Sequence, residues 1–362
     1  MITRRLALAL SLGAAGSGFF AHRNAMAASR KYRIPAKSEP HARTWMQWPA
    51  RADIWGGAGN LDAVRQTIAR VANAVARFEE VVMLVRPDQL ANAGELCGPA
   101  IKLVAMPVDD LWAADSGPMF VIDDRGALAV VDLNFNGWGN KQDHASDAQI
   151  AWRVAEYCGV PRRDSGFVAD GGAMEVDGDG TLITTESTLL NDNRNPNVGK
   201  AELEARLKAA FGLEKIIWIP GLRGADVTDG HPDAFVRYVR PGAVVAEIPA
   251  QDDGLWFDAA KEAVSILKAA TDARGRKLEV TVMRGPATTR SDVGEFAASY
   301  LGFHPCNGGL VMPQFGDANG DALARETLAQ LHPGRTVVQI DADVIAAGGG
   351  SIHCATRQQP AL

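Results

Sequence analysis

The sequence has few cysteines and no excess of basic residues. Its four cysteines, Cys97, Cys158, Cys306 and Cys354, are widely spaced and form no Cys-x-x-Cys pair. This spacing disfavours a metal cage or a disulfide-dense scaffold, and whether any of the first three pair stays open. The formal net charge of −6 argues against nucleic acid as a partner and suits a cationic ligand.

The chain also lacks an apolar run long enough to cross a membrane. The best candidate, residues 6–20, is interrupted by Gly13, Gly16 and Ser17 and is shorter than the roughly 20 apolar residues that a span needs, so a membrane anchor is the weaker alternative. Arg4 and Arg5 precede this run, and Ala25-Met26-Ala27 fits a signal-peptidase site. The pattern is typical of a twin-arginine export signal.

We therefore expect residues 1–27 to be an export signal peptide, 28–42 a linker, and 43–362 one folded domain of a periplasmic or secreted protein. Residues 1–27 contain three arginines and no acidic residue, so cleavage would change the formal charge from −6 to −9. After cleavage we expect no membrane association. The oligomeric state stays open, a homo-oligomer included.

Three stretches of the sequence resemble one another: "DSGPMFVIDDRGALAVVD" from Asp115, "DGGAMEVDGDGTLITTE" from Asp170 and "DGHPDAFVRYVRPGAVVAE" from Asp229. Each begins with Asp and a nearby glycine, continues as an apolar strand, turns at a glycine and returns as a second strand. "CNGGLVMPQFGDANG" from Cys306 and "AGGGSIHCATRQQ" from Ala347 look related. The sequence thus predicts repeated hairpins.

Helical patterns run between these hairpins, the clearest over residues 61–80, where apolar residues recur at steps of three and four. Others are predicted at about 146–157, 200–211, 256–271 and 321–331, and most are followed by a short β-branched run such as "VVMLV" or "TVVQI". Hairpin, helix and strand repeated about five times predict an α/β ring of ββαβ modules whose chain ends meet. A stacked β/α solenoid is the alternative.

In such a ring the same end of every hairpin faces the central axis, so the starts of the repeats would share one pocket. Carboxylates, one histidine and one cysteine stand at these positions. The predicted pocket residues are Trp112, Asp115, Asp170, Asp229, His231, Asp233, Asn307, Gly350 and Cys354.

Cys354 is the predicted nucleophile. A free cysteine is more often a small buried hydrophobe, but Gly348–Gly350 bring backbone close to a ligand and polar residues follow. His231, between Gly230 and Pro232, lies on no apolar stripe, and we expect Asp233 to share its strand face. Asp229 with Gly230 also suits a turn, and His353, next to Cys354, is expected to face away.

A tryptophan face and several carboxylates around a cysteine indicate a planar cation such as a guanidinium. Trp112 could instead be core, and Asp115 could be a cap or turn residue. "WAADSGPMF", "DGGAMEVDGDGTLITTESTLLNDNRNP", "TDGHPDAFVRYV", "NGGLVMPQFGD" and "GGGSIHC" occur in this order. Together, over about residues 43–359, they resemble the agmatine deiminase and bacterial peptidylarginine deiminase family.

The resemblance implies a five-bladed α/β propeller of the pentein type, with 43–362 as a guanidine-deiminase catalytic domain. It implies that Asp115 and Asp233 grip the guanidinium, that Cys354 attacks its carbon, and that His231 protonates the departing ammonia and then activates water. No metal or organic cofactor is implied. Agmatine, leading to N-carbamoylputrescine and polyamine metabolism, is the first expected substrate, and peptidyl- or free arginine, giving citrulline, the second.

Two positions depart from the family pattern. The family motif is usually Trp-x-Arg-Asp, and Ala114 stands at the position of its arginine. Asp170 stands where many members have glutamate. Both changes bear on the specificity for the amine tail of the substrate. An exported, non-catalytic binding protein for a cationic ligand is the alternative from another class. A papain-like protease is disfavoured because there the cysteine precedes the histidine, and a metal hydrolase on His231 and Asp233 is the least favoured reading.

Overall fold

The computed structural model describes residues 31–252, 254–291 and 296–362. The three predicted hairpins are present within them: β5 (Met119–Asp123) with β6 (Leu128–Asp132), β8 (Glu175–Val176) with β9 (Thr181–Thr185), and β11 (Val236–Arg240) with β12 (Ala243–Ile248). Gly126, Gly180 and Gly242 have φ of 80, 94 and 78° at the turns. This left-handed backbone favours glycine.

All five predicted helices also form: α1 (Ala58–Val75), α5 (Ile150–Cys158), α7 (Lys200–Phe211), α8 (Leu255–Ala269) and α9 (Ala318–Leu331). The next strands follow. β7 (Arg162–Asp164), β10 (Lys215–Ile219), β13 (Glu279–Arg284) and β16 (Thr336–Asp341) each pair in parallel with the second strand of a hairpin, and β3 (Val81–Val85) pairs in parallel with β2. Helices α2 (Leu90–Leu96), α3 (Ala113–Ser116), α4 (Gly137–Asn140), α6 (Glu186–Leu189) and α10 (Asp343–Ala346) are shorter.

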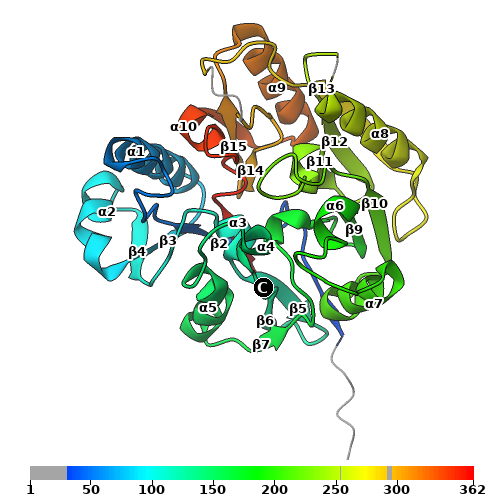
Figure 1. The fold of residues 1–362 in the computed structure, drawn as a ribbon, viewed down its shortest axis with the longest axis horizontal. Helices are drawn as coiled ribbons and strands as arrows, with labels where there is room; N and C mark the ends of the chain where they lie inside the picture. Colours follow the sequence, from blue (N-terminus) through cyan, green and yellow to red (C-terminus); the bar gives the residue numbers. More distant parts are fainter. Residues whose placement is uncertain (1–30, 253, 292–295) are drawn as a thin grey trace, which may run out of the picture. The chain divides into compact units, whose positions relative to one another are not determined.

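In the described parts of the chain the strands form five sheets, which follow one another around a common centre with the longer helices outside (Figure 1). The fourth hairpin is β14 (His304–Cys306) with β15 (Gly309–Gln314). The fifth sheet joins the chain ends: β17 (Arg357–Pro360) runs antiparallel to β2 (His41–Gln47), which precedes β3 and β4 (Ile101–Ala105). The five-bladed ring is therefore confirmed, and the solenoid alternative is wrong.

The folded unit starts earlier than expected. The interval 28–42 was predicted to be a linker, but β1 (Tyr32–Arg33) pairs antiparallel with β5, and Lys37 is buried with 7% of its surface exposed. Ring closure at β17 and β2 brings this segment against the core, so from Lys31 onward it belongs to the fold. The predicted signal at 1–27 lies outside the described residues.

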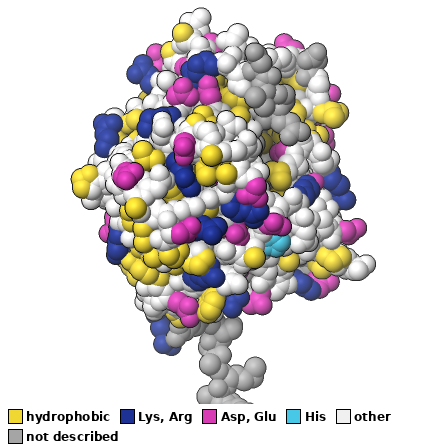
Figure 2. All heavy atoms as spheres, turned by 60° about the vertical axis from the view of Figure 1, so that its left-hand side comes forward, with side chains coloured by type: hydrophobic (Ala, Val, Ile, Leu, Met, Phe, Trp, Pro, Cys, Tyr) yellow, Lys and Arg dark blue, Asp and Glu magenta, His cyan; other side chains and the backbone are white. Residues whose placement is uncertain are grey.

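Apolar periodicity explains how the helices pack. On α1, Leu61, Val64, Ile68, Val71 and Val75 are all buried, and they contact the cluster that includes β3. The opposite helix face carries polar residues. In the described part of the chain, no helix is long and apolar enough to cross a membrane, and on the face shown in Figure 2 acidic and basic side chains are intermixed.

Candidate active site

Four segments of the chain converge on one cavity of about 150 Å³. They include the loop before α1, the chain around α3 and α4, the loop before His231 and the glycine run near the C-terminus. The cavity is lined by Ile54, Trp55, Asp110, Trp112, Asp115, Trp138, Gln142, Val227, Thr228, Gly348, Gly349, Gly350 and Cys354. Of the nine predicted pocket residues, Trp112, Asp115, Gly350 and Cys354 line it directly.

The three glycines make room for two tryptophan rings. A Cβ on Gly348 would overlap the ring of Trp55, and a Cβ on Gly350 would overlap the ring of Trp112. Gly349 has φ of +84°, a conformation that L side chains rarely adopt. The glycine run therefore lets the backbone lie against two tryptophan rings beside Cys354.

Cys354 lies in a turn at one side of this cavity, with its Sγ 3.6 Å from Oδ2 of Asp233. Burial, together with the negative charges of Asp233 and Asp115, raises the pKa of the thiol well above its usual value. The thiol is therefore protonated when the cavity holds no cation. A cation placed among these groups would favour the thiolate.

His231 lies immediately before a short 3₁₀ helix, Pro232–Ala234, so the expectation that it shares a strand face with Asp233 is wrong. Its Nε2 is 3.0 Å from Oδ2 of Asp170, and its Nδ1 is 3.9 Å from Oδ1 of Asp115. Burial opposes the charged form, but the Asp170 hydrogen bond and the charges of Asp115, Asp170 and Asp233 raise the pKa of His231 to about 9. The imidazolium form is thus held ready to donate a proton at neutral pH.

Asp115 is oriented by two neighbours. Its Oδ1 accepts a hydrogen bond from the Gly172 N–H at 2.9 Å, and its Oδ2 accepts one from Trp138 Nε1 at 3.1 Å. Burial, with the like charges of Asp170 and Asp233, raises its pKa to about 6, although His231 opposes the shift. A bound cation would favour its ionised form.

Asp170 and Asp229 do not line the cavity, contrary to prediction. Oδ2 of Asp170 accepts hydrogen bonds from Nε and Nη2 of Arg194, at 2.9 and 2.6 Å, and Oδ2 of Asp229 accepts one from Nη1 at 2.8 Å. One fully buried guanidinium therefore holds both carboxylates. Asp170 orients His231, and Asp229, with φ of 64°, shapes the turn that precedes it.

Asn307 also lies away from the cavity. It stands in the turn between β14 and β15, where its amide bonds the backbone N–H and carbonyl of His41. The prediction is wrong because the glycines of "CNGG" mark the turn of this hairpin and not its start.

His353 has contacts that strand alternation did not predict. Residues 352–355 form turns, and the His353 ring bonds Oδ2 of Asp233 through Nδ1 and Nζ of Lys37 through Nε2, both at 2.6 Å. Oδ2 of Asp233 thus contacts both this imidazole and the Cys354 thiol.

Sequence reasoning missed several cavity residues. Asp110 is fully buried; its Oδ1 accepts from Trp55 Nε1 at 3.0 Å and its Oδ2 from Gln142 Nε2 at 3.1 Å. Trp138 has φ of 55°, which is rare for a bulky residue and marks the site. The acidic pair just before Trp112 was the one signal in the sequence that could have indicated Asp110.

A cation does stand beside position 114. Arg357, buried on β17, donates a hydrogen bond to the Ala114 carbonyl. Burial lowers the pKa of Arg357 to about 10, while Asp115 and Glu175 oppose the shift. Another strand therefore provides a guanidinium next to the residue where the motif lacks one.

Two groups of side chains could hold a metal ion only by giving up existing hydrogen bonds. Among the described residues, His41, Glu79 and His304 form one such group, and Asp233, His353 and Cys354 form another. His41 already bonds Glu79 and the Lys37 carbonyl, and His304 bonds Thr44. Both groups are accounted for as hydrogen-bonded clusters.

The family model for Porphyromonas-type peptidyl-arginine deiminase matches residues 33–360. The chain is 40% identical to an agmatine deiminase of Pseudomonas aeruginosa, with 91% of this chain and 96% of that protein aligned. It is 39% identical to one of Stutzerimonas stutzeri over the same shares. Among solved structures, the agmatine deiminase of Enterococcus faecalis superposes with a TM-score of 0.86 at 32% identity, covering 91% of this chain and 96% of that one.

Proposed function

The chain belongs to the Porphyromonas-type peptidyl-arginine deiminase family, and from this we propose that it is a cysteine-dependent hydrolase that converts agmatine to N-carbamoylputrescine and ammonia. The observation that carries the proposal is the cavity itself, where the Cys354 thiol, the Asp115 carboxylate and three tryptophans meet. Carboxylates and aromatic faces are the groups that bind a planar guanidinium.

The first chemical step forms a carbon–sulfur bond. The guanidinium enters between Asp115 and Asp233, and its charge stabilises the thiolate, so the thiol, which donates a hydrogen bond to Asp233 in the empty cavity, releases its proton to solvent as the substrate binds. The thiolate attacks the central carbon. The His231 imidazolium then protonates one amino group, the carbon–nitrogen bond breaks, and ammonia leaves a cationic thiouronium adduct.

The second step returns the enzyme to its starting state. Neutral His231 removes a proton from water as the oxygen attacks the adduct carbon. The carbon–sulfur bond then breaks, the hydroxyl proton of the adduct passes to the departing sulfur, which is a thiol again, and the amidine has become a urea. His231 is an imidazolium again, which its raised pKa favours.

The cavity lining favours agmatine over free arginine. None of the described lining residues is Lys or Arg, so an α-carboxylate would find no cation there. Ile54, Trp55 and Val227 provide apolar surface for a methylene chain, and Asp110 adds a second carboxylate that suits the distal ammonium.

Incubation with agmatine, free arginine and a blocked arginine peptide tests this proposal. Ammonia release and the mass change from amidine to urea measure turnover, and agmatine is expected to have the highest kcat/KM. Cys354→Ser should abolish turnover while retaining agmatine binding. Binding of agmatine by the wild type without product would instead support the non-catalytic binding protein.

We also propose that the protein is exported. The support is the sequence of residues 1–27: paired arginines, a short apolar run and an A-x-A site. Cell fractionation with N-terminal sequencing tests it. Arg4→Lys with Arg5→Lys should retain the protein in the cytoplasm, whereas unchanged fractionation would contradict the proposal.

A further inference from the structure

A line of buried hydrogen bonds extends from Asp233 away from the cavity. His353 Nδ1 is 2.6 Å from Oδ2 of Asp233, and His353 Nε2 is 2.6 Å from Nζ of Lys37. Lys37 Nζ in turn donates to Oε2 of Glu175 at 2.8 Å. Lys37, His353 and Glu175 are 7, 1 and 1% exposed, so water does not compete for these bonds.

The chemistry of these groups determines which atom donates in each bond. An ammonium has three donors and no acceptor, so Nε2 of His353 must accept from Lys37. Burial lowers the pKa of His353 well below its usual value, which keeps the ring neutral. A neutral ring with Nε2 as acceptor carries its proton on Nδ1, and that proton points at the Asp233 carboxylate.

Lys37 is fixed in turn by an anion. Glu175 also accepts from Arg237 Nε at 3.2 Å and from the Tyr238 backbone N–H at 2.9 Å. Burial favours the neutral acid, but the charges of Arg237 and Lys37 lower the pKa of Glu175 and keep it ionised. Burial lowers the pKa of Lys37 to about 8, although Glu175 opposes this, so the amine is an ammonium at neutral pH.

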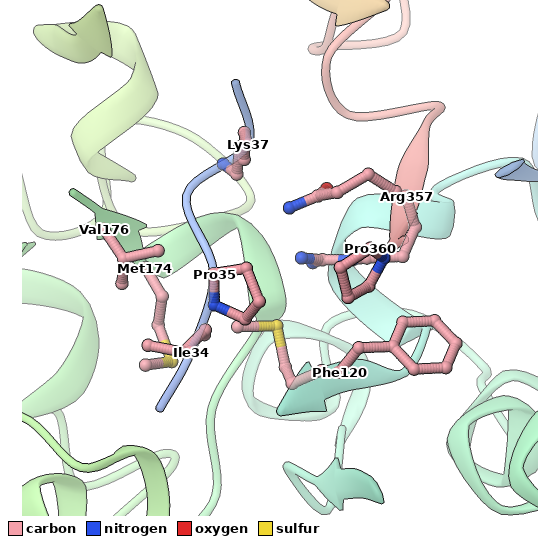
Figure 3. Close-up of a pocket in the computed structure, with 10 residues that line it drawn as sticks. Ile34, Pro35, Lys37, Phe120, Met174, Val176, Arg357 and Pro360 are labelled. Carbon is pink, nitrogen blue, oxygen red and sulfur yellow. The ribbon is translucent and has the colours of Figure 1, made fainter. Parts of the chain in front are cut away.

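Lys37 reaches this position from the segment between β1 and β2 that was expected to be a linker. Figure 3 shows Lys37 on one side of a second, very small cavity and Arg357 of β17 on the other. Its volume of about 10 Å³ is about that of one water, so the side chains around it are closely confined. Segments from both ends of the chain thus meet behind Asp233.

We propose that Lys37 and His353 are positioning residues: the Lys37 ammonium selects the Nδ1–H tautomer of His353, and this N–H fixes the Asp233 carboxylate for gripping the substrate guanidinium. The inference rests on the proposed function and deepens it. Without the His353 donor, Asp233 would rotate about its side-chain torsions and lose its alignment with the guanidinium plane, so substrate binding weakens more than the chemical step.

Steady-state kinetics with agmatine test the proposal on His353→Leu, His353→Asn, Lys37→Met and Lys37→Arg. His353→Leu and Lys37→Met should raise KM about 10- to 100-fold, which is the change expected when one hydrogen bond to a charged group is lost. The change in kcat should be smaller. His353→Asn keeps an N–H near the place of Nδ1 and should recover part of the loss, as should Lys37→Arg. His332→Leu, a buried histidine outside this line, should leave KM within about twofold.

A wild-type KM in His353→Leu, or a His353→Asn variant no better than His353→Leu at equal thermal stability, would overturn the inference. A binding measurement separates this failure from failure of the proposed function. Calorimetry compares the agmatine affinity of Cys354→Ser with that of Cys354→Ser carrying His353→Asn or Lys37→Met as a second substitution. If the wild type does not turn over any guanidine, the proposed reaction fails. Even then, a tenfold lower agmatine affinity when Lys37→Met is added to Cys354→Ser supports the positioning role, and equal affinity of the two proteins contradicts it.

Discussion

The Sγ of Cys354 lies 3.6 Å from Oδ2 of Asp233, so the proposed nucleophile donates a hydrogen bond to a carboxylate. This contact keeps the thiol protonated until a cation arrives, because burial and the Asp233 and Asp115 charges raise its pKa. Reactivity would thus depend on the substrate's own charge. Such an arrangement protects the thiol from oxidants that attack thiolates.

Replacing Asp233 with Asn should make Cys354 more reactive toward iodoacetamide. Removing the negative charge lowers the thiol pKa, and each unit increases the thiolate fraction about tenfold. Peptide mass spectrometry at pH 7.5 measures alkylation at each cysteine. Cys97, whose pKa burial raises to about 11, provides an internal control. Equal Cys354 rates in both proteins would refute the charge effect.

Activity should decline as pH rises above about 9, where His231 loses its proton. Burial lowers the His231 pKa, but the Asp170 hydrogen bond and the charges of Asp115, Asp170 and Asp233 more than offset this and raise it to about 9. Protonated His231 paired with Asp170 therefore contributes its full stabilisation of the folded state below the ordinary histidine pKa of about 6.5. This contribution is lost as the pH rises through about 9. In Asp170→Asn the alkaline limb of the kcat profile should move down by roughly one unit; an unmoved limb would assign it to another group.

Gly350→Ala should destabilise the protein and strongly reduce kcat/KM. The new methyl would overlap the Trp112 ring, and overpacking of this kind costs about 1–3 kcal/mol. Gly59→Ala is the matched control, because no atom lies within 4 Å of its Cβ position on α1. Thermal melting and agmatine kinetics measure both effects. Wild-type behaviour of Gly350→Ala would mean that the glycine is not needed for space.

Arg194→Met should lower the free energy of unfolding by about 3–5 kcal/mol, since it leaves the buried Asp170 and Asp229 carboxylates without their cation. Lys200→Met removes an exposed ion pair with Glu186 and should cost under about 1 kcal/mol. Urea denaturation of the two variants compares them directly. Similar losses would show that the Arg194 pair contributes no more than a surface pair.

Much of the fold was predictable because it is encoded locally. The apolar positions of α1 recur with helical periodicity, and each predicted hairpin has its own turn glycine. Cys354 and Gly350 could be placed at the pocket for a similar reason: glycines that make room for a close approach are visible in the sequence itself. The error at Asn307 came from the same source, since a glycine-rich turn looks like a glycine-rich strand start.

The sequence by itself determined the repeat, the ring and the kinds of side chain available to the pocket. Only the tertiary structure decided which carboxylate faces the cavity and which is neutralised behind it. Asp115 and Asp170 have similar local sequences, yet one lines the cavity and the other pairs with Arg194. Lys37 meets His353 across 316 positions. Whether a buried charge stays free for a ligand depends on its nearest counter-charge, and packing of distant segments decides where that is.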